Sequence, residues 1–221
     1  MTLAQPPEPS TRTSGLVIRT PRRYDLRLWL GSRGREGRFR DEEIRLARIR
    51  PGERVLDLGC GTGSLAIAAA RAVGRAGTVT AIDPSNEMLA RARSKARRAR
   101  VDATFVATAG EALPFPDAGF DVVLISLVLH QLPSDALHGT MVQVRRVLRP
   151  GGRLFVVDLG TPEAGKRTVH SHGTPASGGA RFTLDGLEMF FDHLGLRVVE
   201  RGDIEFRFRN LEPLRYVLAE A

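Results

Sequence analysis

The chain has 221 residues, of which 42% are hydrophobic and 26% are charged, a composition that excludes a disordered or membrane-embedded chain and fits one folded domain. No apolar run approaches the roughly 20 residues of a membrane helix, and the first 20 residues lack the apolar core of a signal peptide, so we expect a cytoplasmic protein. The single cysteine, Cys60, excludes a disulfide within the chain and disfavours a thiolate metal site, so no metal is expected.

The formal charge of +8 would suit nucleic acid or an anionic membrane surface. Nearly all the basic residues are arginines, because Lys95 and Lys166 are the only lysines. The arginines gather in residues 12–50 and 91–100, and the second group lies among alanines on an expected helix, which favours a solvated helix face. With 6% aromatic residues the chain scarcely offers a base-stacking platform, so nucleic acid is not expected as a partner.

The N-terminal part divides into two expected pieces. Residues 1–20 are rich in Pro, Ser and Thr and are predicted to be a disordered tail. Residues 21–50 are predicted to form a helical cap, with a short amphipathic segment at 24–29 and a helix at 39–49 whose first turn is acidic. Pro51-Gly52 ends that helix.

Strands and helices then alternate. The expected strands are 54–58, 77–82, 103–107, 121–126 and 153–158, and the expected helices are 64–73, 85–99, 134–148 and 183–194. Repeated units of this kind predict an α/β, doubly wound, mostly parallel sheet with helices on both faces. Two last strands, near 196–201 and 203–209, are joined by too few residues for a crossover helix and must form an antiparallel hairpin. The seven-stranded domain is expected at 51–210, followed by a C-terminal helix at 211–221.

One long segment interrupts this rhythm. Residues 160–182 carry no predicted element, so we expect either a functional loop, such as a lid over a substrate, or disorder. His170 and His172 lie in this loop. Two loop histidines without a carboxylate or thiol partner make a poor metal site, which favours a solvated loop.

The segment Arg54–Gly63 (RVLDLGCGTG) is the centre of the chain. A buried strand leads into a turn with Gly59, Gly61 and Gly63, and the turn runs directly into a strong helix former at 64–70. This arrangement presents backbone N–H groups at the positive end of a helix dipole. Glycine is needed where a tight turn lets a ligand lie against bare backbone, although a purely structural strand-to-helix turn is the alternative.

Asp83 ends the second predicted strand, about 20 residues beyond the glycines. A carboxylate at this place accepts hydrogen bonds from the two ribose hydroxyls of an adenosine ligand. The alternative is that Asp83 caps the next helix. Ser85 can do that by itself, which favours ribose binding.

Several motifs resemble those of class I S-adenosylmethionine (AdoMet) methyltransferases. The G-x-G-x-G spacing, with Asp57 two residues ahead, resembles their motif I, whereas a dinucleotide loop would require glycine at Ser64. Residues 109–123 (AGEALPFPDAGFDVV) resemble the "DAEALPFPD…FDVV" segment of the group that acts on quinones and other small molecules. Residues 146–152 (RVLRPGG) resemble the segment before that group's fifth strand. The resemblance covers roughly 54–158.

This resemblance implies a Rossmann-like fold, AdoMet as cofactor, S-adenosylhomocysteine as product and a small-molecule acceptor. It implies that the cofactor contacts Tyr24, Asp57, Gly59, Gly61, Gly63, Asp83, Pro84, Met88, Ala109, Gly110, Glu111 and Ser126. Relatives usually carry an acidic residue at Ala109 that binds the adenine amino group. In this chain the adenine edge is expected to be recognised by backbone at Ala109 and Gly110, by Thr108 or through water.

Methyl transfer from a sulfonium is an in-line displacement with a neutral leaving group, so alignment of the reactants is the enzyme's main contribution. A base is needed only when the nucleophile carries a proton of high pKa. Ser126, His130 and Asp158 follow strands whose carboxyl ends should border the ligand. His130 is the candidate base, with a helix-start histidine satisfied by backbone as the alternative. His138 and His193 lie on expected helices and are interpreted as structural.

Three other functions remain open. An NAD-linked oxidoreductase shares the ribose carboxylate, and a non-catalytic AdoMet-binding protein is suggested by Ala109. A base-methylating enzyme would need a D/N/S-P-P-Y/F turn after the fourth strand, where this chain has SLVL at 126–129. We predict a small and lipophilic acceptor, such as a quinone precursor or a phospholipid headgroup, and a basic N-terminal segment that contacts an anionic membrane surface.

Overall fold

The computed structural model describes residues 8–159, 184, 188–209 and 213–221. The long loop predicted at 160–182, with His170 and His172, lies outside the described residues. No helix in the described part of the chain combines the length and the apolar character that crossing a membrane requires.

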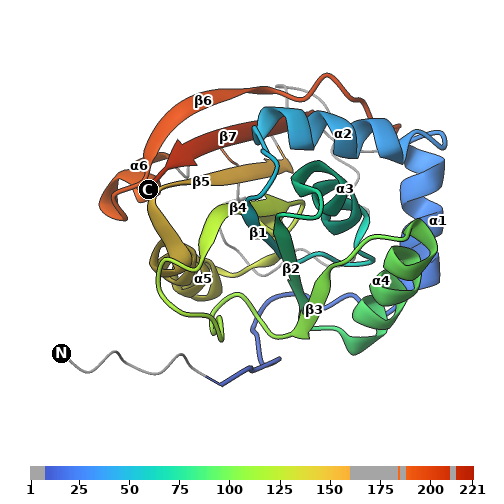
Figure 1. Cartoon of the computed structure of the whole chain (residues 1–221), viewed down its shortest axis with the longest axis horizontal. Coiled ribbons are helices and arrows are strands. Elements are labelled where there is room, and N and C mark those ends of the chain that lie inside the picture. Colours follow the sequence, from blue (N-terminus) through green and yellow to red (C-terminus); the bar gives the residue numbers. More distant parts are fainter. Residues whose placement is uncertain (1–7, 160–183, 185–187, 210–212) are drawn as a thin grey trace.

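One seven-stranded sheet forms the centre of the molecule, as predicted (Figure 1). Its strand order is β3-β2-β1-β4-β5-β7-β6, and β1 to β5 run parallel while β7 is antiparallel to both of its neighbours. The strands are β1 (Arg54–Leu58), β2 (Thr78–Asp83), β3 (Thr104–Ala107), β4 (Phe120–Ser126), β5 (Leu148–Leu159), β6 (Arg197–Asp203) and β7 (Leu214–Glu220). The strand order reverses between β1 and β4, and ligands of such sheets bind at the carboxyl edge beside this point.

Helices pack on both faces of the sheet. They are α1 (Pro21–Gly31), α2 (Glu36–Leu46), α3 (Ser64–Val73), α4 (Asn86–Ala99), α5 (Ser134–Val147), α6 (Glu188–His193) and the short 3-10 turn η1 (Leu129–Gln131). Residues of α2, α3 and α4 belong to the core on one face, and residues of α5 and α6 to the core on the other. Figure 1 shows α1 at the outer edge of the first group, beside α4.

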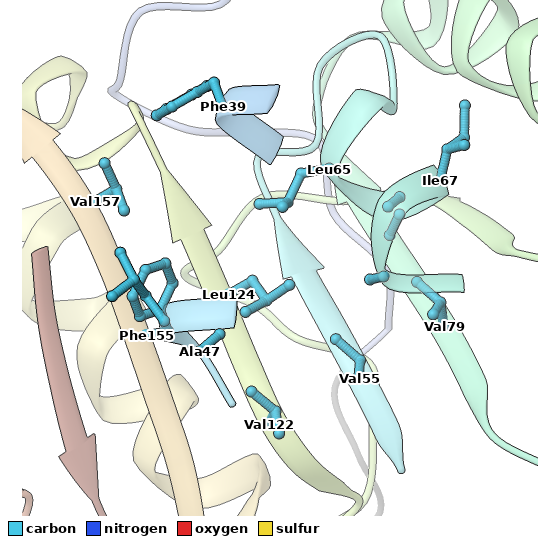
Figure 2. Packing of buried hydrophobic residues seen from close by; sticks show 14 of the residues in the cluster. Phe39, Ala47, Val55, Leu65, Ile67, Val79, Val122, Leu124, Phe155 and Val157 are labelled. Carbon is cyan, nitrogen blue, oxygen red and sulfur yellow. The ribbon is translucent and has the colours of Figure 1, made fainter. Parts of the chain in front are cut away.

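The two cores follow from the alternation of side chains along each strand. In β1, Val55 faces the core under α2 and α3, whereas Leu56 and Leu58 face the core under α5. Figure 2 shows the first core, where Phe39 of α2 and Leu65 of α3 lie over the strand residues. By the same alternation Asp57 lies on the α2 side of the sheet, where it is 2% exposed.

The C-terminal part differs from the prediction in where its last strand lies. The antiparallel pair is present, but its second strand is β7 rather than 203–209, and residues 214–220 form this strand instead of the predicted C-terminal helix at 211–221. Leu214–Glu220 pairs on one side with β5 and on the other with β6. Two ladders of hydrogen bonds outweigh the local helix preference, so the domain extends to residue 220, beyond the predicted limit of 210.

The N-terminal part differs from its prediction in the segment that precedes α1. Residues 21–50 form the helical cap as two helices, α1 and α2. Residues 8–20 contain no helix or strand, yet backbone hydrogen bonds join Ser10 to Ala109 and Leu16 to Gln131, so this segment is not the disordered tail that its composition predicts.

Phe39→Ala is expected to lower the free energy of unfolding by about 3–5 kcal/mol, the usual range for removing a fully buried ring. Phe39 is 0% exposed and contacts the rings of Phe206 and Phe208, with centroids 5.6 and 5.0 Å away. Urea unfolding measures the change. Val142→Ala on α5, where Val142 is 39% exposed, is the control and should stay within about 0.5 kcal/mol of the parent. A loss for Phe39→Ala no larger than for this control would contradict the packing role.

Candidate functional site

Backbone conformation and crowding explain why glycine stands at three positions after β1. All have positive φ, at 73° for Gly59, 53° for Gly61 and 79° for Gly63. A Cβ on Gly59 would lie 2.5 Å from a methyl group of Val128, and one on Gly63 would lie 2.8 Å from the Cβ of Ala92. At Gly61 a Cβ would meet only the tips of Met88 and Tyr24, at 3.6 and 3.9 Å, so its positive φ rather than crowding favours glycine in this part of the cavity wall.

Asp83 joins this glycine turn to the end of β2. Its Oδ2 accepts a hydrogen bond from the Gly61 N–H at 3.0 Å, and its Oδ1 accepts one from the Ser85 N–H at 2.8 Å. Ser85 caps α4 by accepting from the Met88 N–H at 3.2 Å, which leaves Asp83 free of that task, as predicted. Burial raises the pKa of Asp83 to about 6 although both backbone hydrogen bonds oppose the shift.

A cavity opens beside these groups at the carboxyl ends of β1, β2 and β4. Its empty volume is about 720 Å³ with the open solvent at its mouth included. Ten of the site residues predicted from the sequence line it: Tyr24, Gly59, Gly61, Asp83, Pro84, Met88, Ala109, Gly110, Glu111 and Ser126. Asp57, Gly63 and His130 do not line this cavity.

Asp57 lies below the cavity in a buried polar cluster. Burial raises its pKa to about 7, and its Oδ2 has no hydrogen-bond partner among the residues described. The neighbouring α2 contributes Arg40, whose guanidinium donates to Glu43 at 2.7 Å and to the Ser126 hydroxyl at 3.0 Å. Burial also raises the pKa of Glu43, which is 0% exposed and accepts a hydrogen bond from Ser126. The cluster thus connects α2 to the floor of the cavity.

The burial of the Arg40–Glu43 pair was not predicted from the sequence. An Arg and a Glu three residues apart on a helix with an acidic first turn are typical of a solvated face. Only the packing of α2 against β4 reveals that this pair is buried and that it holds a residue of the cavity wall. The signal that remained in the sequence was Phe39, which lies four residues before Glu43 and therefore marks the same side of α2 as buried.

The segment before α1 forms a further wall of the cavity. Residues from Thr13 to Ile18 line it, and the Thr13 hydroxyl donates to the Glu111 carboxylate at 2.6 Å. Farther out, the Ala109 N–H donates to the Ser10 carbonyl at 2.7 Å, and the Ser10 N–H donates to the Thr108 hydroxyl at 3.2 Å. Two of the groups expected to recognise an adenine edge, the Ala109 N–H and the Thr108 hydroxyl, are therefore already bonded to Ser10.

Tyr24 and Asp25 hold α1 against the glycine turn. Tyr24 lines the cavity, and Asp25 accepts hydrogen bonds from the Thr62 hydroxyl at 2.7 Å and from Arg91 of α4 at 2.8 Å. Lys95 donates to the Ser64 hydroxyl at 2.6 Å, which ties α4 to the start of α3. Helix α1 is therefore part of the site's frame.

His130 and Asp158 form a pair at the ends of β4 and β5. The His130 Nδ1 lies 2.6 Å from the Asp158 Oδ1. Asp158 is 0% exposed and also accepts backbone N–H bonds from Leu129, His130 and Leu159. The His130 side chain is 27% exposed, so the carboxylate fixes a ring whose other edge is open to solvent. The chain on both sides of His130 lines the cavity, through Val128 and Gln131.

Within the described ranges no three His, Cys, Asp or Glu side chains are grouped as ligands for a metal ion.

Comparison with known proteins shows that this domain is similar to methyltransferases. Residues 55–152 match a family described as a methyltransferase domain. The chain is 35% identical over 153 residues to a protein from Shewanella pealeana named ubiquinone/menaquinone biosynthesis C-methyltransferase UbiE, a match that spans 68% of this chain and 60% of that protein. The chain thus matches less than two thirds of the length of this relative.

Solved structures show the same fold. A SAM-dependent methyltransferase from Aquifex aeolicus superposes with a TM-score of 0.68 at 20% identity, covering 91% of this chain and 98% of that one. The [4+2]-cyclase SpnF superposes with the same TM-score of 0.68 at 23% identity, covering 83% and 80%. Because these identities are low, the two structures establish the fold alone.

Asp83→Ala is expected to weaken binding of S-adenosylhomocysteine by about 1–3 kcal/mol, because the two ribose hydroxyls of the ligand would lose their buried acceptor. Titration calorimetry at pH 7.5 measures the change, with Asp102→Ala, which removes an exposed carboxylate, as the control. The pKa of Asp83 near 6 adds a pH dependence. Affinity should fall as the pH drops below about 6, where the carboxyl is protonated, and Asp83→Asn should lose this dependence. An affinity unchanged by either substitution would contradict the assignment.

Asp57→Asn is expected to raise the melting temperature of the ligand-free protein at pH 8 more than at pH 5. A folded-state pKa of about 7 exceeds the unfolded value of 3.8, so the folded protein retains a proton that the unfolded chain has lost between these values. Stability therefore falls as the pH rises from about 4 to about 7, and the amide removes this loss. Thermal melts followed by circular dichroism measure it, and equal differences at both pH values would contradict a buried, strained carboxylate.

Proposed function

Because this chain contains a class I AdoMet-dependent methyltransferase domain, we propose that it transfers the methyl group of AdoMet to a small, quinol-type organic acceptor. One observation carries the proposal. The bare backbone at Gly61 and the Asp83 carboxylate lie side by side, joined by a hydrogen bond, on the wall of a cavity at the point where the strand order reverses. Nucleoside ligands of doubly wound sheets bind at this position.

The residues that line the cavity fit AdoMet. Asp83 would accept the ribose hydroxyls, since each of its oxygens retains a lone pair after one backbone bond. Gly61 leaves room for the amino-acid part, because a Cβ there would point at the space between Met88 and Tyr24. Thr140 belongs to the wall beside Gly110, and its buried hydroxyl has no hydrogen-bond partner among the residues described.

The adenine end of the site rests on different groups from those expected. Ser10 occupies the Ala109 N–H, so the adenine edge is left to Gly110, to Glu111 and to the Ser10 segment itself. The family's acidic residue is absent at Ala109. We infer that the segment before α1 compensates by enclosing the adenine rather than by recognising it with a side chain.

Bound AdoMet would supply an electrophilic methyl group on a sulfonium whose departure creates no anion. The chain's own residues then have two tasks. The first is alignment and exclusion of water, which the walls formed by Thr13–Ile18 and Tyr24 provide by covering the cavity. The second is removal of a proton from the acceptor. Asp158 accepts the Nδ1–H of His130, which orients the ring and leaves Nε2 as the atom that can take this proton.

The quinol-type acceptor is supported by the relative named UbiE, whose printed name describes a C-methyltransferase of ubiquinone and menaquinone biosynthesis. Methylation of a ring carbon is assisted when a neighbouring hydroxyl loses its proton, which gives His130 a role with such an acceptor. The lipophilic acceptor would also bring the protein to a membrane surface.

The experiment is a transfer assay with methyl-labelled AdoMet and a panel of quinols that have a free ring carbon. Label on a ring carbon supports the proposal. Label on oxygen would retain the methyltransferase but reject carbon as the acceptor atom. Binding of AdoMet without transfer to any member of the panel, or to acceptors in a cell extract, would instead favour a non-catalytic AdoMet-binding protein. Tighter binding of NADH than of AdoMet in calorimetry would favour an oxidoreductase.

His130→Gln and Asp158→Asn are each expected to lower kcat by about 10²–10⁴-fold, the usual contribution of a general base, with little change in S-adenosylhomocysteine affinity. His130 does not line the cofactor cavity, so binding and turnover should separate. His138→Gln, on the exposed side of α5, is the matched control. Full activity in His130→Gln would contradict the assignment of His130 as the general base.

A further inference from the structure

The outward face of α1 carries three large apolar side chains. Leu26, Trp29 and Leu30 are 56%, 58% and 56% exposed. Their spacing of three and four residues places them together on one side of the helix. The opposite side faces the protein, where Leu28 is buried and Tyr24 lines the cavity. Helix α1 is therefore apolar on its solvent side as well as on its inner side, which is unusual for a surface helix.

The side chains around this stripe are basic. Arg22 and Arg23 are exposed on α1, and Arg33 and Arg38 are exposed on the turn and helix that follow. The two acids nearest to this stripe along the chain, Asp25 and Glu36, are engaged by other residues of the protein, whereas Asp41 farther along α2 is exposed. Asp25 binds Thr62 and Arg91, and Glu36 lies 3.7 Å from the buried Arg40. The side chains that α1 itself exposes are thus apolar or basic.

The position of α1 connects this surface to the cavity. The segment that lines the cavity at Thr13–Ile18 continues directly into α1, and Asp25 ties the helix to the glycine turn through Thr62. Figure 1 shows α1 on the outer edge of the molecule, beyond α4 and next to the start of α2. A surface that binds the outward face of α1 would lie beside the wall of the cavity.

We propose that α1 is an interfacial helix that docks this protein on an anionic lipid surface. Leu26, Trp29 and Leu30 enter the boundary between headgroups and acyl chains, and the surrounding arginines contact lipid phosphates. The combination of chemistry identifies this partner. Tryptophan is favoured at a membrane interface because its ring is apolar and its N–H is polar. The role assigned to this docking, bringing a lipophilic acceptor to the cavity, rests on the function proposed above.

Other partners fit this face less well. A nucleic acid would be bound by the arginines, but single-stranded bases need a row of aromatic rings for stacking, and two leucines beside one tryptophan do not provide it. A second copy of the chain would bring the same arginines face to face, since a symmetric interface pairs a patch with itself. A lipid surface satisfies both the apolar stripe and its positive border.

The chain contains one tryptophan, so Trp29 reports on this face directly. The full-length protein is mixed with vesicles of equal parts phosphatidylglycerol and phosphatidylcholine, and separately with vesicles of phosphatidylcholine alone. We expect flotation with the anionic vesicles, a blue shift of the Trp29 emission, and quenching when the acyl chains are brominated. No blue shift and no quenching with bound anionic vesicles would overturn the proposal, because contact would then occur through another face.

Two double substitutions separate the apolar and the basic contributions. Leu26→Ser with Leu30→Ser is expected to lower the vesicle partition coefficient by about tenfold or more while Trp29 remains as the probe. Arg22→Glu with Arg23→Glu should lower it by a similar factor and reduce its dependence on salt. The matched controls are Val142→Ser, at an exposed apolar site on α5, and Arg71→Glu with Arg75→Glu, in the last turn of α3 and just after it. Both controls should bind as the parent does.

The changed residues lie outside the cavity, so melting temperature and S-adenosylhomocysteine affinity verify that each variant is folded. If the charge-reversal control lowered the vesicle partition coefficient as much as Arg22→Glu with Arg23→Glu does, net charge alone would explain the binding. That result would reject α1 as the docking helix. A Trp29 blue shift that depends on protein concentration without lipid, with dimers in sedimentation, would identify a second copy instead. A change in Trp29 emission on addition of RNA, with no change on addition of lipid, would identify nucleic acid as the partner of this face. Vesicle binding is measured without acceptor or AdoMet, so its failure is distinguishable from a failure of methyl transfer.

Discussion

The site depends on the hydrogen bond from the Gly61 N–H to the Asp83 carboxylate, which holds the turn after β1 against the end of β2. Parallel strands bring these two places together, because their carboxyl ends meet at the same edge of the sheet. Burial raises the pKa of Asp83 to about 6 and that of Asp57 to about 7, so the ligand-free domain holds two carboxyl groups whose charged form is destabilised by burial. At Asp83, which lines the cavity, the same burial leaves a preformed acceptor that a bound ligand can satisfy.

The N-terminal part completes this site from outside the sheet. Thr13–Ile18 and Tyr24 supply walls, and Arg40 with Glu43 holds Ser126 from below. The sheet alone would leave the carboxyl edge open to water, in which a methyl donor and its acceptor would be poorly aligned. In the proposed function the ends of β1 and β2 would hold the cofactor, and the first two helices with the segment before them would cover it.

The fold itself does not select the reaction. A SAM-dependent methyltransferase and a [4+2]-cyclase superpose on this chain with equal TM-scores. What distinguishes this chain must be sought at the ends of β4 and β5, where the buried Asp158 fixes one edge of the His130 ring and leaves the other exposed. The outward face of α1 adds a second distinguishing surface at the opposite side of the cavity wall.

The sequence by itself determined the parallel strands, the glycine turn, the place of Asp83 and the capping role of Ser85, because each depends on residues close together in the chain or on a strict side-chain period. It could not determine β7, which becomes a strand by pairing with β5 and β6. It could not reveal that Ser10 binds Ala109 or that Arg40 is buried. Only the tertiary structure decided these features, since polar residues look alike in sequence whether they face solvent or another segment that folds over them.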